Sequence, residues 1–184
     1  ESGSVNKKVK LDAGSETPIS THLKEESRIA REFDSLSIHT KMSNILKDKV
    51  AIVTGAGRGI GRGIATLMAS EGAQVVVVDP GVSVSGSGLD NSVADEVVME
   101  IQEAGGVAIA CYESVTSMLG GEAIVKAGVD HFGKVDIVVT CAGILRDRMI
   151  FNMSEEEWDD VIDVHLKGTF TVVRHACALF RQQR

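Results

Sequence analysis

The sequence of 184 residues lacks features that several classes of protein require. Its 19 lysines and arginines are outnumbered by 26 aspartates and glutamates, which gives a formal net charge of −7. A nucleic-acid-binding domain needs a basic face, so we expect no nucleic acid as a partner. No apolar run approaches the roughly 18 residues that cross a bilayer, so we expect no membrane partner either.

Cysteine and proline are scarce as well. The three cysteines, Cys111, Cys141 and Cys177, form neither a C-x-x-C pair nor a zinc-binding pattern. An odd number of widely spaced cysteines favours a reducing compartment, so we expect a cytoplasmic protein and no metal site. The sequence does contain 43% hydrophobic residues and 19 glycines. That apolar content is sufficient for a sizeable buried core.

The first 41 residues differ in composition from the rest of the chain. They mix charges of both signs with many serines and threonines and keep no sustained hydrophobic period. Within them, Thr21–Leu36 could form one amphipathic helix capped by Thr21. We expect residues 1–41 to be an extension, disordered or partly helical, that precedes a domain covering residues 42–184.

From Val50 onward, short apolar runs alternate with segments of helical periodicity. The expected strands are Val50–Thr54, Gln74–Asp79, Gly106–Cys111 and Val135–Thr140. The expected helices are Gly59–Glu71, Asn91–Ala104, Ser117–Phe132 and a long stretch that opens with the capping box Ser154–Glu157. Strands buried on both faces and joined by helices form parallel sheets. The pattern predicts an α/β fold, a Rossmann-like doubly wound sheet that is truncated after about four strands.

A glycine-rich segment, Thr54–Gly61 (TGAGRGIG), lies between the first strand and the first helix. Its glycines follow the spacing G-x-x-x-G-x-G through Gly55, Gly59 and Gly61. Glycine lets a backbone turn tightly and approach a pyrophosphate, and the helix N-terminus supplies unpaired N–H groups. A flexible turn would have a similar composition, but the strand–turn–helix context favours a dinucleotide-binding loop.

Asp79 ends the second strand, 20 residues after Gly59. A carboxylate at this place can accept hydrogen bonds from the ribose hydroxyls of an adenosine. It would also repel the additional phosphate of NADP, so the sequence favours NAD over NADP. Arg58 could offset part of that repulsion, which keeps NADP as the less favoured alternative. Asp79 could also simply cap the turn after its strand.

Four segments together resemble the short-chain dehydrogenase/reductase family over about Leu46–Arg184. They are Thr54–Gly61, Asp79, Val135–Gly143 (VDIVVTCAG) and Val164–Phe170 (VHLKGTF). Within that family, Gly143–Met149 and Tyr112–Val115 look like the 3-hydroxyacyl-CoA dehydrogenase domain of type 2 peroxisomal multifunctional enzymes and its bacterial relatives. The resemblance implies an oxidoreductase that acts on a secondary alcohol or ketone, with 3-hydroxyacyl-CoA as a candidate substrate.

The resemblance also implies roles for particular residues. It assigns the pyrophosphate to Gly55, Arg58, Gly59, Ile60 and Gly61, the ribose to Asp79, the adenine to Ser114 and Val115, and the nicotinamide-side ribose to Cys141, Ala142 and Gly143.

Two positions depart from the family pattern. Thr140-Cys141 stands where the family usually has two asparagines, which puts the anchoring of that turn in doubt and leaves a reactive thiol as an alternative. His165 stands where the family's catalytic tetrad has an asparagine, and either a structural or an acid–base role is open to it.

The catalytic residues that the family uses are missing from the sequence. The family abstracts the hydroxyl proton with a Tyr-x-x-x-Lys pair and holds the substrate oxygen with a serine. The one tyrosine here, Tyr112, is followed four residues later by Thr116. We therefore expect the N-terminal, cofactor-binding part of a dehydrogenase, inactive by itself and homo-oligomeric at full length. The alternative is a non-catalytic NAD-binding or scaffold fragment. By resemblance, the peroxisome is a second possible location.

Overall fold

A computed structural model of the chain describes residues 44–82, 88 and 90–183. The expected extension at residues 1–41, including the candidate helix Thr21–Leu36, lies outside the described residues. From residue 44 onward the chain alternates strands and helices in the expected order. No helix in the described ranges is long and apolar enough to cross a membrane.

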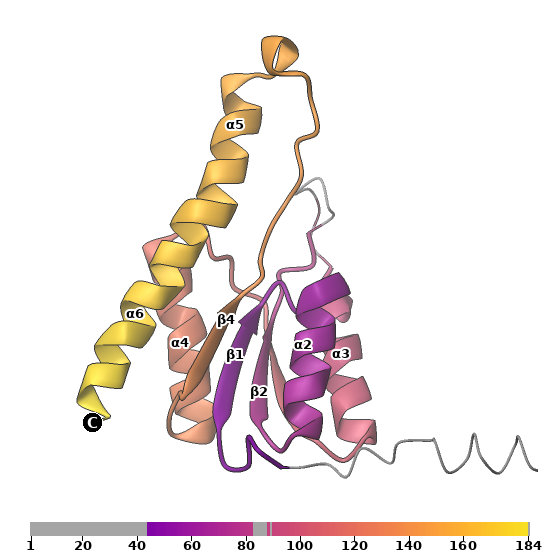
Figure 1. Cartoon of the computed structure of the whole chain (residues 1–184), viewed down its shortest axis with the longest axis vertical. Coiled ribbons are helices and arrows are strands. Elements are labelled where there is room, and N and C mark those ends of the chain that lie inside the picture. Colours follow the sequence, from indigo (N-terminus) through magenta and orange to yellow (C-terminus); the bar gives the residue numbers. More distant parts are fainter. Residues whose placement is uncertain (1–43, 83–87, 89, 184) are drawn as a thin grey trace, which may run out of the picture. The chain divides into compact units, whose positions relative to one another are not determined.

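The described residues contain one parallel sheet with the strand order β3-β2-β1-β4 (Figure 1). Its strands are β1 (Val50–Thr54), β2 (Gln74–Val78), β3 (Val107–Cys111) and β4 (Ile137–Thr140). Ile52 of β1 is in register with Val76 of β2 on one side and with Val138 of β4 on the other. All three pairings are parallel, so the carboxyl ends of the four strands meet at one edge of the sheet.

Helices cover both faces of this sheet (Figure 1). They are α2 (Gly59–Ser70), α3 (Ser92–Glu103), α4 (Met118–Phe132) and α6 (Gly168–Gln182). A short 3₁₀ turn, Ile150–Asn152, and helix α5 (Glu155–Ile162) lie between β4 and α6 in the chain. Helices α2 and α3 pack on one face, and α4 and α6 pack on the other. This arrangement confirms the expected doubly wound α/β fold.

The core follows from the period of two along each strand. Ala51 and Val53 point to the face covered by α2 and α3, whereas Ile52 points to the face covered by α4 and α6. Every residue of β1 is buried. A strand buried on both faces carries a continuous apolar run instead of an alternation, which is the pattern that predicted it.

Most expected elements match the observed ones within one residue at each end, and two differ by more. Strand β4 begins at Ile137 and not at Val135, because the Val135 N–H donates to the Gln183 side chain at 3.2 Å and its carbonyl accepts from the same amide at 2.7 Å. The expected single C-terminal helix is interrupted between α5 and α6 by a π-helical segment, Asp163–Lys167. The helical stretch as a whole begins where expected, since Ser154 and Glu157 form a complete capping box at the start of α5.

Candidate functional site

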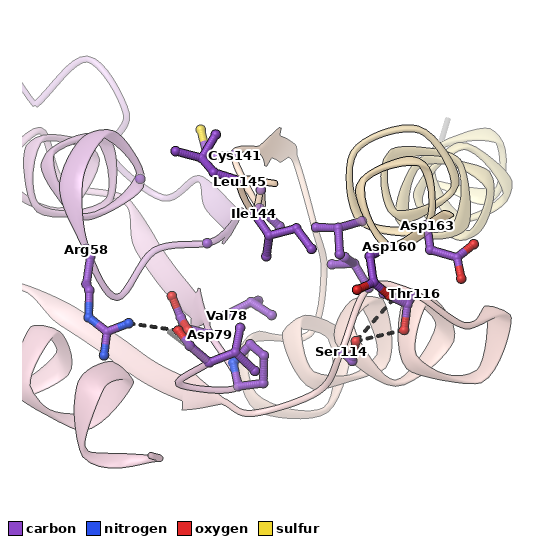
Figure 2. Close-up of a pocket in the computed structure, with 18 of the residues that line it drawn as sticks. Arg58, Val78, Asp79, Ser114, Thr116, Cys141, Ile144, Leu145, Asp160 and Asp163 are labelled. Carbon is purple, nitrogen blue, oxygen red and sulfur yellow. Dashed lines mark hydrogen bonds between the residues drawn. The ribbon is translucent and has the colours of Figure 1, made fainter. Parts of the chain in front are cut away.

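The carboxyl ends of the four strands border a cavity of about 750 Å³ (Figure 2). Ligands of open α/β sheets bind at this edge, where the strand order reverses. Among the predicted cofactor-binding residues, those that line the cavity are Gly55, Arg58, Ile60, Gly61, Asp79, Ser114, Val115, Cys141, Ala142 and Gly143. Gly59 is the one predicted residue that does not line the cavity. The fold brings the others together from four separate turns.

The glycine turn between β1 and α2 leaves no room for side chains at three positions, Gly55, Gly57 and Gly61. A Cβ atom on Gly61 would collide with the carbonyl oxygen of Gly55. A Cβ on Gly55 would lie 2.7 Å from the Ala142 Cα, so the turn also touches the segment after β4. Gly59 has open space around it but a φ of +54°, so its contribution is conformational. Close backbone packing thus shapes the turn around the start of α2.

The first turn of α2 is open to an anion. Its N-cap residue, Arg58, makes no side-chain capping hydrogen bond, and the first turn contains no acidic residue. Unpaired N–H groups and the positive end of the helix dipole are therefore directed toward the cavity. The Arg58 guanidinium itself donates to the Val82 carbonyl at 2.8 Å. A phosphate group is the ligand that such a helix start favours.

Asp79 lies at the end of β2 with only 8% of its surface exposed. One carboxylate oxygen accepts the Gly57 N–H at 3.0 Å, and the other accepts the Gly81 N–H at 2.8 Å. The second bond is the turn-capping contact that the sequence left open as an alternative. A carboxylate has about four acceptor positions, so beyond these two bonds it can still accept from a ligand's hydroxyl groups.

The turn after β3 forms another wall of the cavity. Ser114 and Thr116 share a hydrogen bond between their hydroxyl groups at 3.0 Å, and both line the cavity beside Val115 (Figure 2). Tyr112 is directed elsewhere, because its hydroxyl donates to Asp95 at 2.6 Å. That hydrogen bond raises the pKa of Tyr112. The sequence's one tyrosine is therefore poorly suited to act as a base.

The turn after β4 is anchored without the family's asparagines. The Thr54 hydroxyl accepts the N–H groups of Cys141 and Ala142, each at 3.2 Å. Thr54 was not among the predicted site residues, because a threonine at the end of an apolar strand gives no sign of a partner so far along the chain. Its side chain is buried and links β1 to the segment that borders the cavity at Cys141. The anchoring that seemed doubtful is thus supplied by a hydroxyl.

We expect Thr54→Val to lower the free energy of unfolding by about 1–3 kcal/mol, because the part-buried N–H of Ala142 would lose its acceptor, whereas that of Cys141 also donates to the Thr54 carbonyl. The matched control is Thr54→Ser, which keeps the hydroxyl and should lie closer to the wild-type stability. Denaturant unfolding followed by circular dichroism measures both. Equal stabilities for the valine and wild-type chains would show that the hydroxyl does not anchor this turn.

His165 contacts the same segment from the π-helical turn. Its Nε2 lies 3.1 Å from the Ile144 nitrogen and 2.9 Å from the Ile144 oxygen. A Cβ on Gly143 would lie 2.7 Å from the imidazole Cε1. This geometry gives His165 a structural contact, which is one of the two roles considered for it.

The far end of the cavity contains charged residues that were not predicted as site residues. Asp160 and Asp163 line it from α5 and the π-helical segment (Figure 2), and their i, i+3 spacing was the available signal. Arg146 forms an ion pair with Asp160 at 2.8 Å, and Arg148 pairs with Glu157 at 2.7 Å. The two ion pairs hold the loop after β4 against α5. In the described part of the chain, no three His, Cys, Asp or Glu side chains are grouped to hold a metal ion.

Glu157 combines the ion pair with its capping role. The N–H of Ser154 donates to its carboxylate, and this bond, together with Arg148, lowers the pKa of Glu157 despite some desolvation. The carboxylate therefore stays ionised well below neutral pH.

Comparisons with known proteins agree with this geometry. The family model described as short chain dehydrogenase matches residues 49–184. A short-chain type dehydrogenase/reductase from Mycobacterium tuberculosis is 49% identical over 138 residues, which are 75% of this chain and 48% of the relative. Mouse peroxisomal multifunctional enzyme type 2 is 47% identical over 135 residues, 73% of this chain and 18% of that protein.

A second M. tuberculosis protein, a hydroxyacyl-CoA dehydrogenase, is 43% identical over 148 residues, 80% of this chain and 45% of the relative. A crystal structure of a short chain dehydrogenase from Mycobacterium avium superposes with a TM-score of 0.69 at 48% identity, covering 75% of this chain and 49% of that one. The chain thus spans about half or less of the length of these relatives.

Proposed function

Because the chain belongs to the short-chain dehydrogenase family of oxidoreductases, we propose that it forms the NAD-binding part of an enzyme that interconverts a secondary alcohol and a ketone. The observation that carries this proposal is the cavity at the carboxyl edge of the sheet. It combines an uncapped helix start with a buried carboxylate one strand away. A dinucleotide has the matching chemistry, with a pyrophosphate followed by a ribose.

The residues around the cavity can be matched to the successive groups of NAD, from the pyrophosphate to the two riboses and the adenine. The backbone of Gly55–Gly61 would hold the pyrophosphate, in a turn whose close packing of Gly61 on the Gly55 carbonyl excludes a Cβ. Asp79 would accept from the adenosine ribose, and Ser114 with Val115 would flank the adenine. Cys141, Ala142 and Gly143 would pass beside the nicotinamide-side ribose. When bound, the nicotinamide ring exchanges a hydride with the substrate carbon.

NAD is the preferred cofactor in this proposal. The carboxylate of Asp79 is held in place by two backbone N–H groups, so it cannot easily move away from a phosphate on the ribose. Arg58, the nearby residue that could offset the repulsion, already donates to the Val82 carbonyl. Like charges held close together at a partly buried site are unfavourable by several kcal/mol before screening, roughly 4 kcal/mol at 4 Å.

The substrate proposal rests on the relatives. One of them is a hydroxyacyl-CoA dehydrogenase, and we propose a 3-hydroxyacyl-CoA as the substrate class of the whole protein. The 184 residues contain no Tyr-x-x-x-Lys pair, and we propose that another part of the whole protein supplies the base for the alcohol proton. We further propose that the whole protein is a homo-oligomer in the cytoplasm, with the peroxisome as the alternative suggested by relatives such as the mouse enzyme.

Titration of the purified chain with NAD⁺ and NADP⁺ tests the cofactor proposal. We expect NAD⁺ to bind with a dissociation constant at least about tenfold lower than that of NADP⁺, which corresponds to about 1.4 kcal/mol. Isothermal titration calorimetry measures both constants in the same buffer. Tighter binding of NADP⁺ would refute the assignment of Asp79, and no binding of either dinucleotide would refute the proposed function of the cavity.

A further inference from the structure

A buried threonine on α6 contacts the turn after β3, which forms the wall of the cavity at Ser114 and Val115, on the side away from the cavity. Thr171 is 0% exposed, and its hydroxyl oxygen lies 2.6 Å from the carbonyl oxygen of Val115, 56 residues earlier in the chain. The same hydroxyl lies 3.0 Å from the Gly168 carbonyl oxygen. A hydroxyl has one proton to donate, and the shorter contact indicates that Val115 receives it.

The surrounding packing leaves this wall little freedom. A Cβ on Gly168 would lie 2.5 Å from the Val115 Cγ2, and a Cβ on Gly121 of α4 would lie 2.7 Å from the Thr171 backbone. A Cβ on Gly120 would collide with the Ser114 carbonyl. The turn that contains Ser114 and Val115 is therefore clamped between the start of α4 and the start of α6, with the Thr171 hydroxyl as its polar contact.

We propose that Thr171 is a positioning residue for the adenosine half of the cofactor, acting through the carbonyl of Val115. This inference rests on the proposed function, because it requires that NAD occupies the cavity. Val115 is only 7% exposed and lines the cavity. A buried carbonyl that loses its donor must find another partner. Water can reach this turn from the cavity. The peptide that contains the Val115 carbonyl would therefore rotate toward the cavity to find a new donor, and this rotation would displace Ser114 and Val115 from the adenine.

The test compares Thr171→Val with Thr171→Ser in the 184-residue chain. Valine keeps the shape and removes the hydroxyl, whereas serine keeps the hydroxyl. We expect the valine variant to weaken the binding of AMP and of NAD⁺ by the same factor, about tenfold, because the nicotinamide half is proposed to lie beside Cys141–Gly143 and not at this wall. We expect serine to restore both constants to within about twofold of the wild type.

Val125→Ala is the matched stability control. Val125 is a buried residue of α4, so its truncation destabilises the fold but keeps the hydrogen bond from Thr171 to the Val115 carbonyl. Unfolding curves give the folded fraction of each variant, and dissociation constants are compared at equal folded fractions. If Val125→Ala weakens AMP binding as much as Thr171→Val does, Thr171 has only a general structural role and the inference is wrong.

The remaining outcomes are also decisive. Weakened NAD⁺ binding with unchanged AMP binding in Thr171→Val would overturn the inference, and so would wild-type binding of both. A wild-type chain that binds neither AMP nor NAD⁺ would instead overturn the proposed function. Should Thr171→Val fail to fold, Gly168→Ala displaces Val115 from the same side by steric contact and keeps the Thr171 hydroxyl. Unchanged AMP binding in that variant would contradict a role for this wall.

Discussion

Gly61→Ala is expected to raise the dissociation constant for NAD⁺ at least about 100-fold, which corresponds to about 2.7 kcal/mol. The added Cβ would collide with the Gly55 carbonyl oxygen, which belongs to the backbone and cannot rotate away as a side chain does. The turn would have to move off the start of α2, where the pyrophosphate is proposed to bind. Overpacking of this kind also destabilises the fold, by about 1–3 kcal/mol.

The same helix offers a matched control in Gly63. No atom lies within 4 Å of a Cβ placed on Gly63, so Gly63→Ala changes helix propensity alone. It should raise the free energy of unfolding by about 0.5–1 kcal/mol and leave NAD⁺ binding within about twofold of the wild type. Calorimetric titration and denaturant unfolding of both variants provide the comparison. Wild-type NAD⁺ affinity in a folded Gly61→Ala chain would show that the turn does not hold the cofactor.

Asp79→Asn is expected to weaken NAD⁺ binding about 30- to 100-fold and to remove the discrimination against NADP⁺. A hydrogen bond to a charged group contributes about 1.5–3 kcal/mol, and the charge that repels a ribose phosphate disappears with the same substitution. An amide also replaces one acceptor by a donor. It would therefore face the N–H of either Gly57 or Gly81 without bonding it, which loosens the contact between the glycine turn and the end of β2.

Asp95→Asn controls for the loss of one negative charge. Asp95 lies at the start of α3 and accepts from Tyr112, and it is not among the residues that line the cavity. Its NAD⁺ and NADP⁺ constants should both stay within about twofold of the wild type. The informative quantity is the ratio of the two constants in each variant. A ratio in Asp79→Asn that still favours NAD⁺ as in the wild type would rule out Asp79 as the selecting group.

The sheet was predictable because each strand carries its own signal. The bounds Val50–Thr54 expected for β1 are those observed, and β2 and β3 each differ by one residue. Buried parallel strands are continuous apolar runs, and the helices between them are amphipathic, so both can be read within short windows. The glycine turn and Asp79 were predictable for the same reason, since they follow directly from the strands that they end.

The contacts that shape the cavity were not predictable in this way. The hydroxyl of Thr54 holds Cys141 and Ala142, 87 and 88 residues later in the chain, and Thr171 holds Val115 across 56 residues. A threonine in an apolar segment looks the same in sequence whether its hydroxyl has a distant partner or none. The π-helical segment around His165 likewise carries no local signal, because its residues fit an α-helix equally well.

The sequence by itself determined the order of the elements, the parallel sheet and the place of the glycine turn, because these depend on residues near one another in the chain. The tertiary structure alone decided which atoms support the cavity. It showed that Gly61 lies against the Gly55 carbonyl, that the Asp79 carboxylate is held by Gly57 and Gly81, and that the Val115 carbonyl is bonded from α6. These contacts join segments that meet only after the helices have packed on the two faces of the sheet, and a pattern with a period of two or 3.6 residues carries no information about them.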